Sequence, residues 1–353
     1  MTTLNPSNRT LRLHAPRVLK FHDEPRPAPG PGEVLLEILS VGICRSDLDY
    51  YNDGRIGDAV VSEPLVLGHE FSARVIEAGE GVNSSLVGQR VAVEPAVWCN
   101  KCEWCLRGDS NLCPAVRFCG TPPIDGALRR YMAYPAEFMA VLPDEISDDA
   151  GAVLEPLAIG VHALDLARPR LEQSAAIVGC GPVGLSILQA ARAAGAGRLI
   201  VLDRLRWRLN LALELGATDA IDVGREDPVA ALERMTGGRL VDHVFEAGGT
   251  DESPDLSIRL AAPAGKVFLV GIPPGDRINV SAGISRRRGL TVYIVRRSRN
   301  TLDRALSMLE RGLLNADRLD THHFPFAESE QAYQMAHNYE DNVVKAIIRV
   351  REE

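Results

Sequence analysis

The sequence predicts two domains, one built mostly from β-strands and the other an α/β domain with a parallel sheet. Three observations support this prediction. The chain has 353 residues, which is longer than a single hydrophobic core usually grows. Residues 25–150 contain short runs of branched residues separated by turn residues, as β-strands do. From residue 174 onward, strand-like and helix-like runs alternate, which is typical of a parallel sheet covered by helices.

The elements expected in each part follow from these patterns. In the β-rich part, strands are expected at residues 33–42, 70–79 and 89–97. Residues 174–203 predict strand, glycine turn, helix and strand, and further strands are expected at 220–223, 241–247, 266–272 and 290–295. After Val295 the pattern predicts an amphipathic helix at 300–312, ending at Gly312, and a last strand at 343–350.

Composition and charge narrow the function classes. The formal net charge is −8 and the basic runs are short, which argues against a nucleic-acid partner. The N-terminus lacks the apolar core of a signal peptide, and no run of about 18 apolar residues predicts a membrane span. We therefore expect a soluble, cytoplasmic protein that does not bind membranes. Seven cysteines without a secretion signal favour thiolate chemistry over a disulfide framework.

Four of the cysteines lie within fifteen residues, at Cys99, Cys102, Cys105 and Cys113. The spacing C-x2-C-x2-C-x7-C lets four thiolates converge on one tetrahedral ion, and zinc is the expected occupant. Because thiolates then fill every position, this zinc should be structural. An iron-sulfur cluster, a reduced loop, chance disulfides and a nucleic-acid-binding zinc ribbon are the other interpretations. The acidic Glu103 and Asp109 argue against the zinc ribbon.

A glycine motif follows the first strand of the α/β domain. Gly179, Gly181 and Gly184 form G-x-G-x-x-G, with Pro182 and Val183 inside it, where the helix should begin. Such a turn lets a pyrophosphate approach the helix N-terminus, whose unpaired N–H groups favour negative charge. The alternative is a turn whose glycines only pack the helix against the strand.

Asp203 ends the next strand, 19 residues after Gly184. A carboxylate there accepts hydrogen bonds from the hydroxyls of an adenosine ribose and repels a 2′-phosphate. The motif and the acid together predict NAD rather than NADP as cofactor, although the neighbouring Arg204 softens that preference.

A second group of metal-binding residue types lies in the β-rich part. Cys44, His69 and Glu70 offer a thiolate, an imidazole and a carboxylate. Three such ligands leave the open coordination position that a catalytic zinc needs. A buried cysteine and a capped histidine are the ordinary structural alternative.

Together, these motifs resemble those of the zinc-dependent medium-chain alcohol dehydrogenases, and more narrowly the sorbitol and xylitol (polyol) dehydrogenases, along almost the entire chain. The segments that carry the resemblance are VGICRSDLDYY, LVLGHEFSARV, the four-cysteine loop, FCGTPPIDGALRRYM, LEPLAIGVHA, VGCGPVG and RRSRNT. The resemblance implies a GroES-like β-barrel domain over residues 1–155, with residues 296–353 returning to it. It implies a Rossmann NAD-binding domain with a six-stranded parallel sheet over residues 156–295.

The resemblance also implies roles for single residues. Cys44, His69 and Glu70 match the catalytic zinc ligands, and Glu155 matches an acid that binds the metal-bound water or the metal itself. Ser46 matches the hydroxyl that relays the alcohol proton. Substrate-pocket positions are matched by Tyr50, Phe118, Glu155 and Arg297. Cofactor positions beyond the glycine turn and Asp203 are matched by Arg208, Val270, Gly271 and Ile272. Arg296 is also assigned to the cofactor, although it departs from the family pattern by adding a cation next to Arg297.

The implied activity is hydride transfer from a secondary alcohol, a polyol above all, to NAD, with two zinc ions in each chain. The partner is then a small-molecule alcohol, and a homo-oligomer is expected because relatives are dimers or tetramers. Asp49 stands where relatives often carry a histidine of the proton path, and Ser298 where polyol dehydrogenases often have a tyrosine. L-threonine 3-dehydrogenase and butanediol dehydrogenase are the enzymatic alternatives, and a nucleotide-binding sensor or structural protein on the same fold is the non-enzymatic one.

Overall fold

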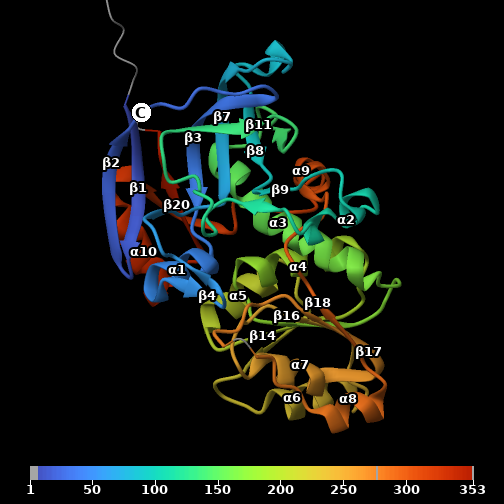
Figure 1. Ribbon diagram of the computed structural model, residues 1–353. Coiled ribbons are helices and arrows are strands. Elements are labelled where there is room, and N and C mark those ends of the chain that lie inside the picture. The colour runs from blue at the N-terminus through green and yellow to red at the C-terminus, as the bar shows by residue number, and fades with distance from the viewer. Residues whose placement is uncertain (1–6, 276, 352–353) are drawn as a thin grey trace, which may run out of the picture. The chain divides into compact units, whose positions relative to one another are not determined.

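The computed structural model describes residues 7–275 and 277–351. They form two compact units, which Figure 1 shows along the chain from blue to red. The first unit contains the described residues up to Glu155 and those from Ala316 onward, and the second unit is Pro156–Asn315.

Residues 296–315 belong to the second unit, whereas the sequence analysis placed all of 296–353 with the first domain. This segment makes a polar contact within the second unit. Arg304 donates two hydrogen bonds to the carboxylate of Asp165, at 2.6 and 2.9 Å, and so fastens the amphipathic helix of this segment to the second unit. Only the segment after Asn315 returns to the first unit.

In the described part of the first unit, the central sheet has seven strands in the order β12-β8-β7-β3-β20-β19, with β11 also paired to β3. Their bounds are β3 (Glu33–Gly42), β7 (Glu70–Ala78), β8 (Arg90–Val93), β11 (Tyr131–Pro135), β12 (Met139–Val141), β19 (Asp320–Pro325) and β20 (Lys345–Arg349). The pair of β19 and β20 is parallel and the other pairs are antiparallel. Because β20 pairs with β3, the end of the chain becomes an inner strand of this sheet.

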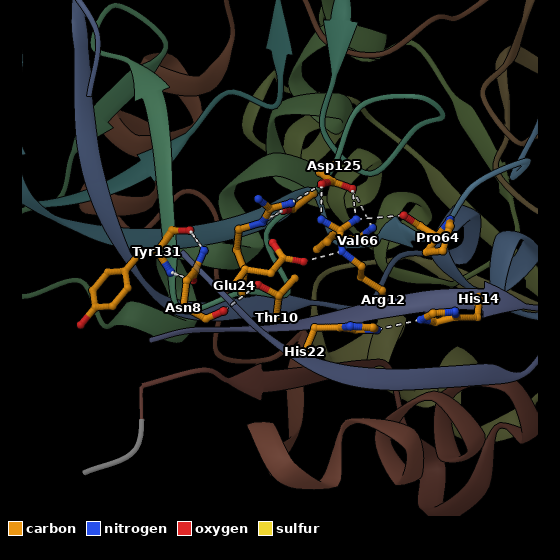
Figure 2. A network of polar contacts seen from close by, with 12 residues as sticks. Asn8, Thr10, Arg12, His14, His22, Glu24, Pro64, Val66, Asp125 and Tyr131 are labelled. Carbon is orange, nitrogen blue, oxygen red and sulfur yellow. Dashed lines mark hydrogen bonds and ion pairs between the residues drawn. The ribbon is translucent and has the colours of Figure 1, made fainter. Parts of the chain in front are cut away.

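A smaller sheet of the first unit has the order β2-β1-β6 and consists of β1 (Asn8–Ala15), β2 (Val18–Glu24) and β6 (Leu65–Val66). Arg12 joins its strands. The guanidinium lies 2.6 Å from the carboxylate of Glu24 and 2.9 Å from that of Asp125. Asp125 also accepts a hydrogen bond from the backbone N–H of Val66 (3.0 Å), as Figure 2 shows. One arginine thus links all three strands through charge-assisted hydrogen bonds.

The remaining elements of the first unit are short. Its helices are α1 (Arg45–Asp53), α2 (Glu103–Leu106), α10 (Ser329–Asn338) and the 3-10 helices η1 (Ser84–Leu86), η2 (Ser110–Leu112), η3 (Phe326–Glu328) and η4 (Glu340–Asn342). Its short strands are β4 (Arg55–Ile56), β5 (Ala59–Val60), β9 (Ala96–Val97) and β10 (Arg117–Phe118). The hydrophobic core packs sheet residues such as Leu36 and Phe71 together with Tyr333 of α10.

Helix α3 (Asp148–Ala167) begins in the first unit and continues into the second. Among the described residues it is the one helix long and apolar enough to cross a membrane, with a mean hydropathy of 1.4 over the window compared. That window is 83% buried inside the protein, as expected of a core helix.

The second unit contains a six-stranded sheet in the order β15-β14-β13-β16-β17-β18, and all of its neighbouring strands are parallel. The bounds are β13 (Ala175–Val178), β14 (Leu199–Asp203), β15 (Asp219–Asp222), β16 (Val241–Glu246), β17 (Ala261–Leu269) and β18 (Thr291–Ile294). The helices are α4 (Pro182–Ala193), α5 (Arg206–Glu214), α6 (Pro228–Thr236), α7 (Ser253–Leu260), α8 (Ala282–Arg288) and α9 (Leu302–Glu310). In Figure 1, α6, α7 and α8 lie on one side of this sheet and α4 and α5 on the other. The predicted six-stranded parallel sheet is therefore confirmed.

The direction of the chain through this sheet reverses at β13. This strand lies between β14 and β16, so the chain runs outward from β13 to β15 and then crosses to β16. At such a reversal the loops at the carboxyl ends of the strands diverge, and doubly wound sheets bind their ligands there. The glycine turn of residues 179–184 follows β13 at this point.

Candidate metal and cofactor sites

Cys44, His69 and Glu70 come together in the first unit. Cys44 is the N-cap of α1, and His69 and Glu70 lie where β7 begins. One ligand atom from each lies within 4.8 Å of the other two, and both His69 and Glu70 are buried. A sulfur, a nitrogen and an oxygen at this separation fit a zinc ion with one position left open.

Asp47 holds this group in place, and the sequence analysis missed it. The buried carboxylate accepts hydrogen bonds from the backbone N–H of Cys44 (2.9 Å) and of Gly68 (3.1 Å). It also lies 3.4 Å from Nδ1 of His69, which leaves Nε2 as the nitrogen that can bind an ion. A carboxylate behind a histidine ligand orients the ring and fixes its tautomer. The signal in the sequence was an acid at the third helical position after Cys44.

Lys345 is a second residue that the sequence analysis missed. Its Nζ lies 2.5 Å from Oε2 of Glu70, and the exposed fractions of the two side chains are 2% and 1%. The same Nζ donates a hydrogen bond to the carbonyl oxygen of Ile43 (3.0 Å). A Cβ at Gly42 would lie 2.6 Å from Oε2 of Glu70, so the ion pair needs a residue without a side chain at that position.

Glu155 lies inside helix α3 and is buried. Burial raises the pKa of Glu155 to about 8, the charge of His69 opposes that rise, and the carboxylate of Glu70 adds to it. These electrostatic interactions place Glu155 near His69 and Glu70. A pKa of about 8 means that this carboxyl is largely protonated at neutral pH, because burial leaves its ionised form poorly solvated.

The other residues expected at the substrate site lie in different surroundings. The ring of Phe118 lies 5.3 Å from the ring of His69, centre to centre, so it forms an apolar wall beside the donors. Ser46 is half-buried in the first turn of α1, and Tyr50 is buried on the same helix within the hydrophobic core. Arg297 belongs to the second unit.

The four-cysteine loop also converges. The ligand atoms of Cys99, Cys102, Cys105 and Cys113 all lie within 4.8 Å of one another. The sulfur of Cys105 is 3.4 Å from that of Cys102 and 4.0 Å from that of Cys99. Four sulfurs bound tetrahedrally to zinc at about 2.3 Å are separated by about 3.8 Å, so these residues fit the ion. Backbone N–H groups of Lys101 and Cys102 lower the pKa of Cys99 to about 6, which favours the thiolate that a metal binds.

In the second unit the glycine turn has the shape of a phosphate cradle. Gly179 has φ of +95°, and a Cβ at Gly184 would lie 1.9 Å from the carbonyl oxygen of Gly179. A Cβ at Gly181 would meet only Nη1 of Arg208 within 4 Å, at 3.8 Å, so the backbone there stays open to a ligand. Gly181 is the N-cap of α4 and Pro182 is in its first turn. The turn therefore fits a dinucleotide pyrophosphate bound at a helix N-terminus.

Asp203 stabilises this turn as well as facing it. Its carboxylate oxygens accept hydrogen bonds from the backbone N–H of Cys180 (2.7 Å) and of Leu205 (2.9 Å). Each oxygen retains a lone pair for a further donor such as a ribose hydroxyl.

Glu246, at the end of β16, organises the neighbouring loops and was also missed. This buried carboxylate accepts hydrogen bonds from the N–H groups of Gly248 (2.8 Å), Gly249 (2.8 Å) and Gly271 (3.1 Å). It thereby fixes the segment of Val270, Gly271 and Ile272 after β17, where the resemblance expects the cofactor. Arg296 is exposed after β18.

Comparisons with known proteins agree with these features. The family model of the alcohol dehydrogenase GroES-like domain matches residues 30–144, and that of the zinc-binding dehydrogenases matches residues 182–311. A sorbitol dehydrogenase of Bacillus subtilis is 34% identical over 349 residues, which are 99% of each chain.

Solved structures show the same fold. An oxidoreductase of unknown specificity from Escherichia coli is 31% identical with a TM-score of 0.92, over 98% of this chain and all of the other. An alcohol dehydrogenase from Escherichia coli CFT073, solved with NADH, is 26% identical with a TM-score of 0.90, over 98% of this chain and 99% of the other. Because two family models match the chain and a sorbitol dehydrogenase is related to it over almost its whole length, this chain belongs to the zinc-dependent medium-chain alcohol dehydrogenase family, close to its polyol dehydrogenases.

Proposed function

We propose that this protein oxidises a secondary hydroxyl of a polyol and transfers the hydride to NAD. The observation that carries the proposal is the convergence of one thiol, one imidazole and one carboxylate from Cys44, His69 and Glu70 in the buried part of the first unit. A set of three ligands belongs to a catalytic metal, because a structural zinc is normally enclosed by four.

Two of the possible donor groups in the described residues are proposed to bind zinc. Cys44, His69 and Glu70 would hold the catalytic ion, and the four-cysteine loop of residues 99–113 would hold a structural one. When bound, the catalytic zinc lowers the pKa of the substrate hydroxyl, and the nicotinamide accepts the hydride.

The protein's own residues prepare that reaction. Asp47 orients the ring of His69, and Phe118 keeps water away from one side of the donors. We assign Ser46 to carry the proton of the substrate hydroxyl away, since a hydroxyl can accept one proton while it donates another. Glu155 would assist at the metal, and Tyr50 would shape the pocket from α1.

NAD is proposed over NADP because of Asp203. A ribose 2′-phosphate would face this carboxylate, whereas a 2′-hydroxyl can donate to it. The NADH-bound relative supports a nicotinamide cofactor in this fold. Arg208, close to the open face of Gly181, is assigned to the adenosine side of the cofactor, together with the exposed Arg296.

A polyol is proposed as substrate because the full-length relative is a sorbitol dehydrogenase and because Arg297 can donate several hydrogen bonds to neighbouring hydroxyls. Butanediol and L-threonine are the alternative substrates, and they lack an extended row of hydroxyls. A homo-oligomer and a cytoplasmic location remain predictions from the resemblance.

The test is steady-state turnover of polyols, diols and L-threonine, each with NAD and with NADP, on protein whose zinc content has been measured. We expect two zinc ions per chain, the highest kcat/KM for a polyol, and NAD preferred by at least about tenfold. A higher kcat/KM for a diol or for L-threonine would show that the proposed polyol is not the substrate. Zinc-loaded, cofactor-bound protein that turns over none of them would favour the sensor alternative.

A further inference from the structure

We propose that Lys345 is the positioning residue for Glu70, and that its charge holds this carboxylate in place when no zinc is bound. The proposal rests on the proposed assignment of Cys44, His69 and Glu70 as a zinc site. It assigns a role in metal binding to a residue of the last strand, far along the chain from the ligands.

The geometry shows that Lys345 is built into the site and does not merely pass near it. Nζ is shared between Oε2 of Glu70 (2.5 Å) and the carbonyl oxygen of Ile43 (3.0 Å), so its direction is fixed from two sides. The backbone behind it is fixed too, because β20 pairs with β3 through Ile347 and Gly42. A lysine is rarely buried to this extent unless its charge is paired.

The charges around Lys345 are mostly negative or potentially negative. Besides Glu70, the thiol of Cys44 and the carboxyl of Glu155 lie within electrostatic range of the ammonium group. In the zinc-free protein, Lys345 therefore compensates a carboxylate that burial would otherwise destabilise.

A zinc ion held by Glu70 would change this balance. It would place a second cation beside the same carboxylate as the ammonium group of Lys345, and two cations at short separation in a buried site repel each other. Lys345 thus stabilises the zinc-free protein more than the zinc-bound protein. By linkage, its removal should destabilise the zinc-free form and make zinc bind more tightly.

The test compares Lys345→Met, which removes the charge at similar length, with Lys345→Arg, which keeps it. Lys266→Met is the matched control, because Lys266 also donates from Nζ to a backbone carbonyl, that of Ala167 (3.0 Å), but lies in the second unit. Zinc affinity is measured by competition with a chelator, and melting temperature is measured with and without zinc.

For Lys345→Met we expect a lower melting temperature without zinc, a larger gain on adding zinc, and zinc affinity at least about tenfold higher. Lys345→Arg should stay within about threefold of wild type in zinc affinity, and Lys266→Met should leave zinc binding unchanged. Unchanged or weaker zinc binding by Lys345→Met would overturn the proposal.

If Lys345→Met does not fold without zinc, the double variant Lys345→Met/Glu70→Gln keeps the proposal testable. Removing both charges should restore folding of the zinc-free protein, and failure to do so would contradict the pairing role. Cys44→Ala is measured alongside. If Cys44→Ala binds as much zinc as wild type, the proposed zinc site itself is wrong. If it loses one zinc while Lys345→Met matches wild type, only the role of Lys345 is wrong.

Discussion

Two of the possible metal-donor groups in the described part of the first unit, the four cysteines and the group of Cys44, His69 and Glu70, are assembled in opposite ways. The four thiols come from one stretch of fifteen residues, Cys99 to Cys113, on a partly exposed loop. Cys44 and the adjacent pair His69 and Glu70 come from two separate segments, and Lys345 of β20, which pairs with β3, forms an ion pair with Glu70. The four cysteines are therefore brought together by one local stretch of sequence, whereas Cys44, His69 and Glu70 are brought together by contacts between segments distant in sequence.

The sharpest way to test this difference is to remove one donor from the buried group. Cys44→Ala should lower kcat/KM by about a thousandfold or more, because the Lewis acid is lost where the substrate hydroxyl binds. Zinc content should fall from two ions to one while cofactor affinity stays near wild type. Turnover at the wild-type rate would remove this group from the mechanism.

The matching change in the loop is Cys99→Ser. We expect the loss of one zinc ion and a melting temperature lower by about 5 °C or more, because the metal no longer orders the loop. Activity per folded molecule should stay within about threefold of wild type at low temperature. Should metal content and melting temperature both remain unchanged, the loop would not hold a structural ion.

A smaller loss of zinc binding is expected when the proposed ligand His69 is kept and only Asp47, which orients its ring, is changed. Asp47→Asn retains the shape of the side chain but weakens its interaction with Nδ1 of His69, so zinc affinity should fall by about 10- to 100-fold. Asp49→Asn on the same helix is the control, because this carboxylate pairs with Arg45 (2.8 Å) and not with a donor. Equal losses in both variants would indicate a general effect on α1.

The smallest change is expected for Asp242, a carboxylate of the second unit that belongs to neither of the two metal-donor groups. Burial favours the protonated form of Asp242, but Arg239 and the N–H of Ser174 outweigh it and lower its pKa to about 2. A pKa below the unfolded value of about 3.8 means that the ionised form stabilises the folded protein above that pH, and that this stability is lost as pH falls toward 2.

Asp242→Asn should therefore cost about 1–2 kcal/mol of unfolding free energy at pH 7, after allowance for partial exposure. The difference from wild type should shrink steadily below pH 4, as measured by denaturant unfolding at several pH values. Zinc content should remain at the wild-type level. A difference that persists unchanged at pH 2 would mean that Asp242 acts through its shape and not its charge.

The features that the sequence predicted well are those made from neighbouring residues. The cysteine spacing, the turn of Gly179 to Gly184 and the acid at Asp203 each lie within one strand, loop or helix start, so their geometry follows from local structure. The alternation of strands and helices predicted the parallel sheet for the same reason.

The features that were missed or misassigned depend on contacts distant in sequence. Lys345 interrupts an apolar strand, VVKAIIRV, and that interruption was the available signal, but its partner Glu70 is known only from the pairing of β20 with β3. Glu155 was assigned from the resemblance alone, and it lies inside α3 with neighbours that are distant in the sequence. Residues 296–315 group with the second unit, where Arg304 pairs with Asp165, and these two residues are far apart in the sequence.

The two hydrogen bonds that Asp203 accepts from the backbone bear on any redesign of nucleotide preference. A smaller neutral residue at this position would make room for a phosphorylated ribose but would also release the N–H groups of Cys180 and Leu205. An engineered switch would then weaken the turn that should receive the new cofactor. Asparagine, whose amide oxygen can keep one of these bonds, is therefore a better starting point than glycine or alanine.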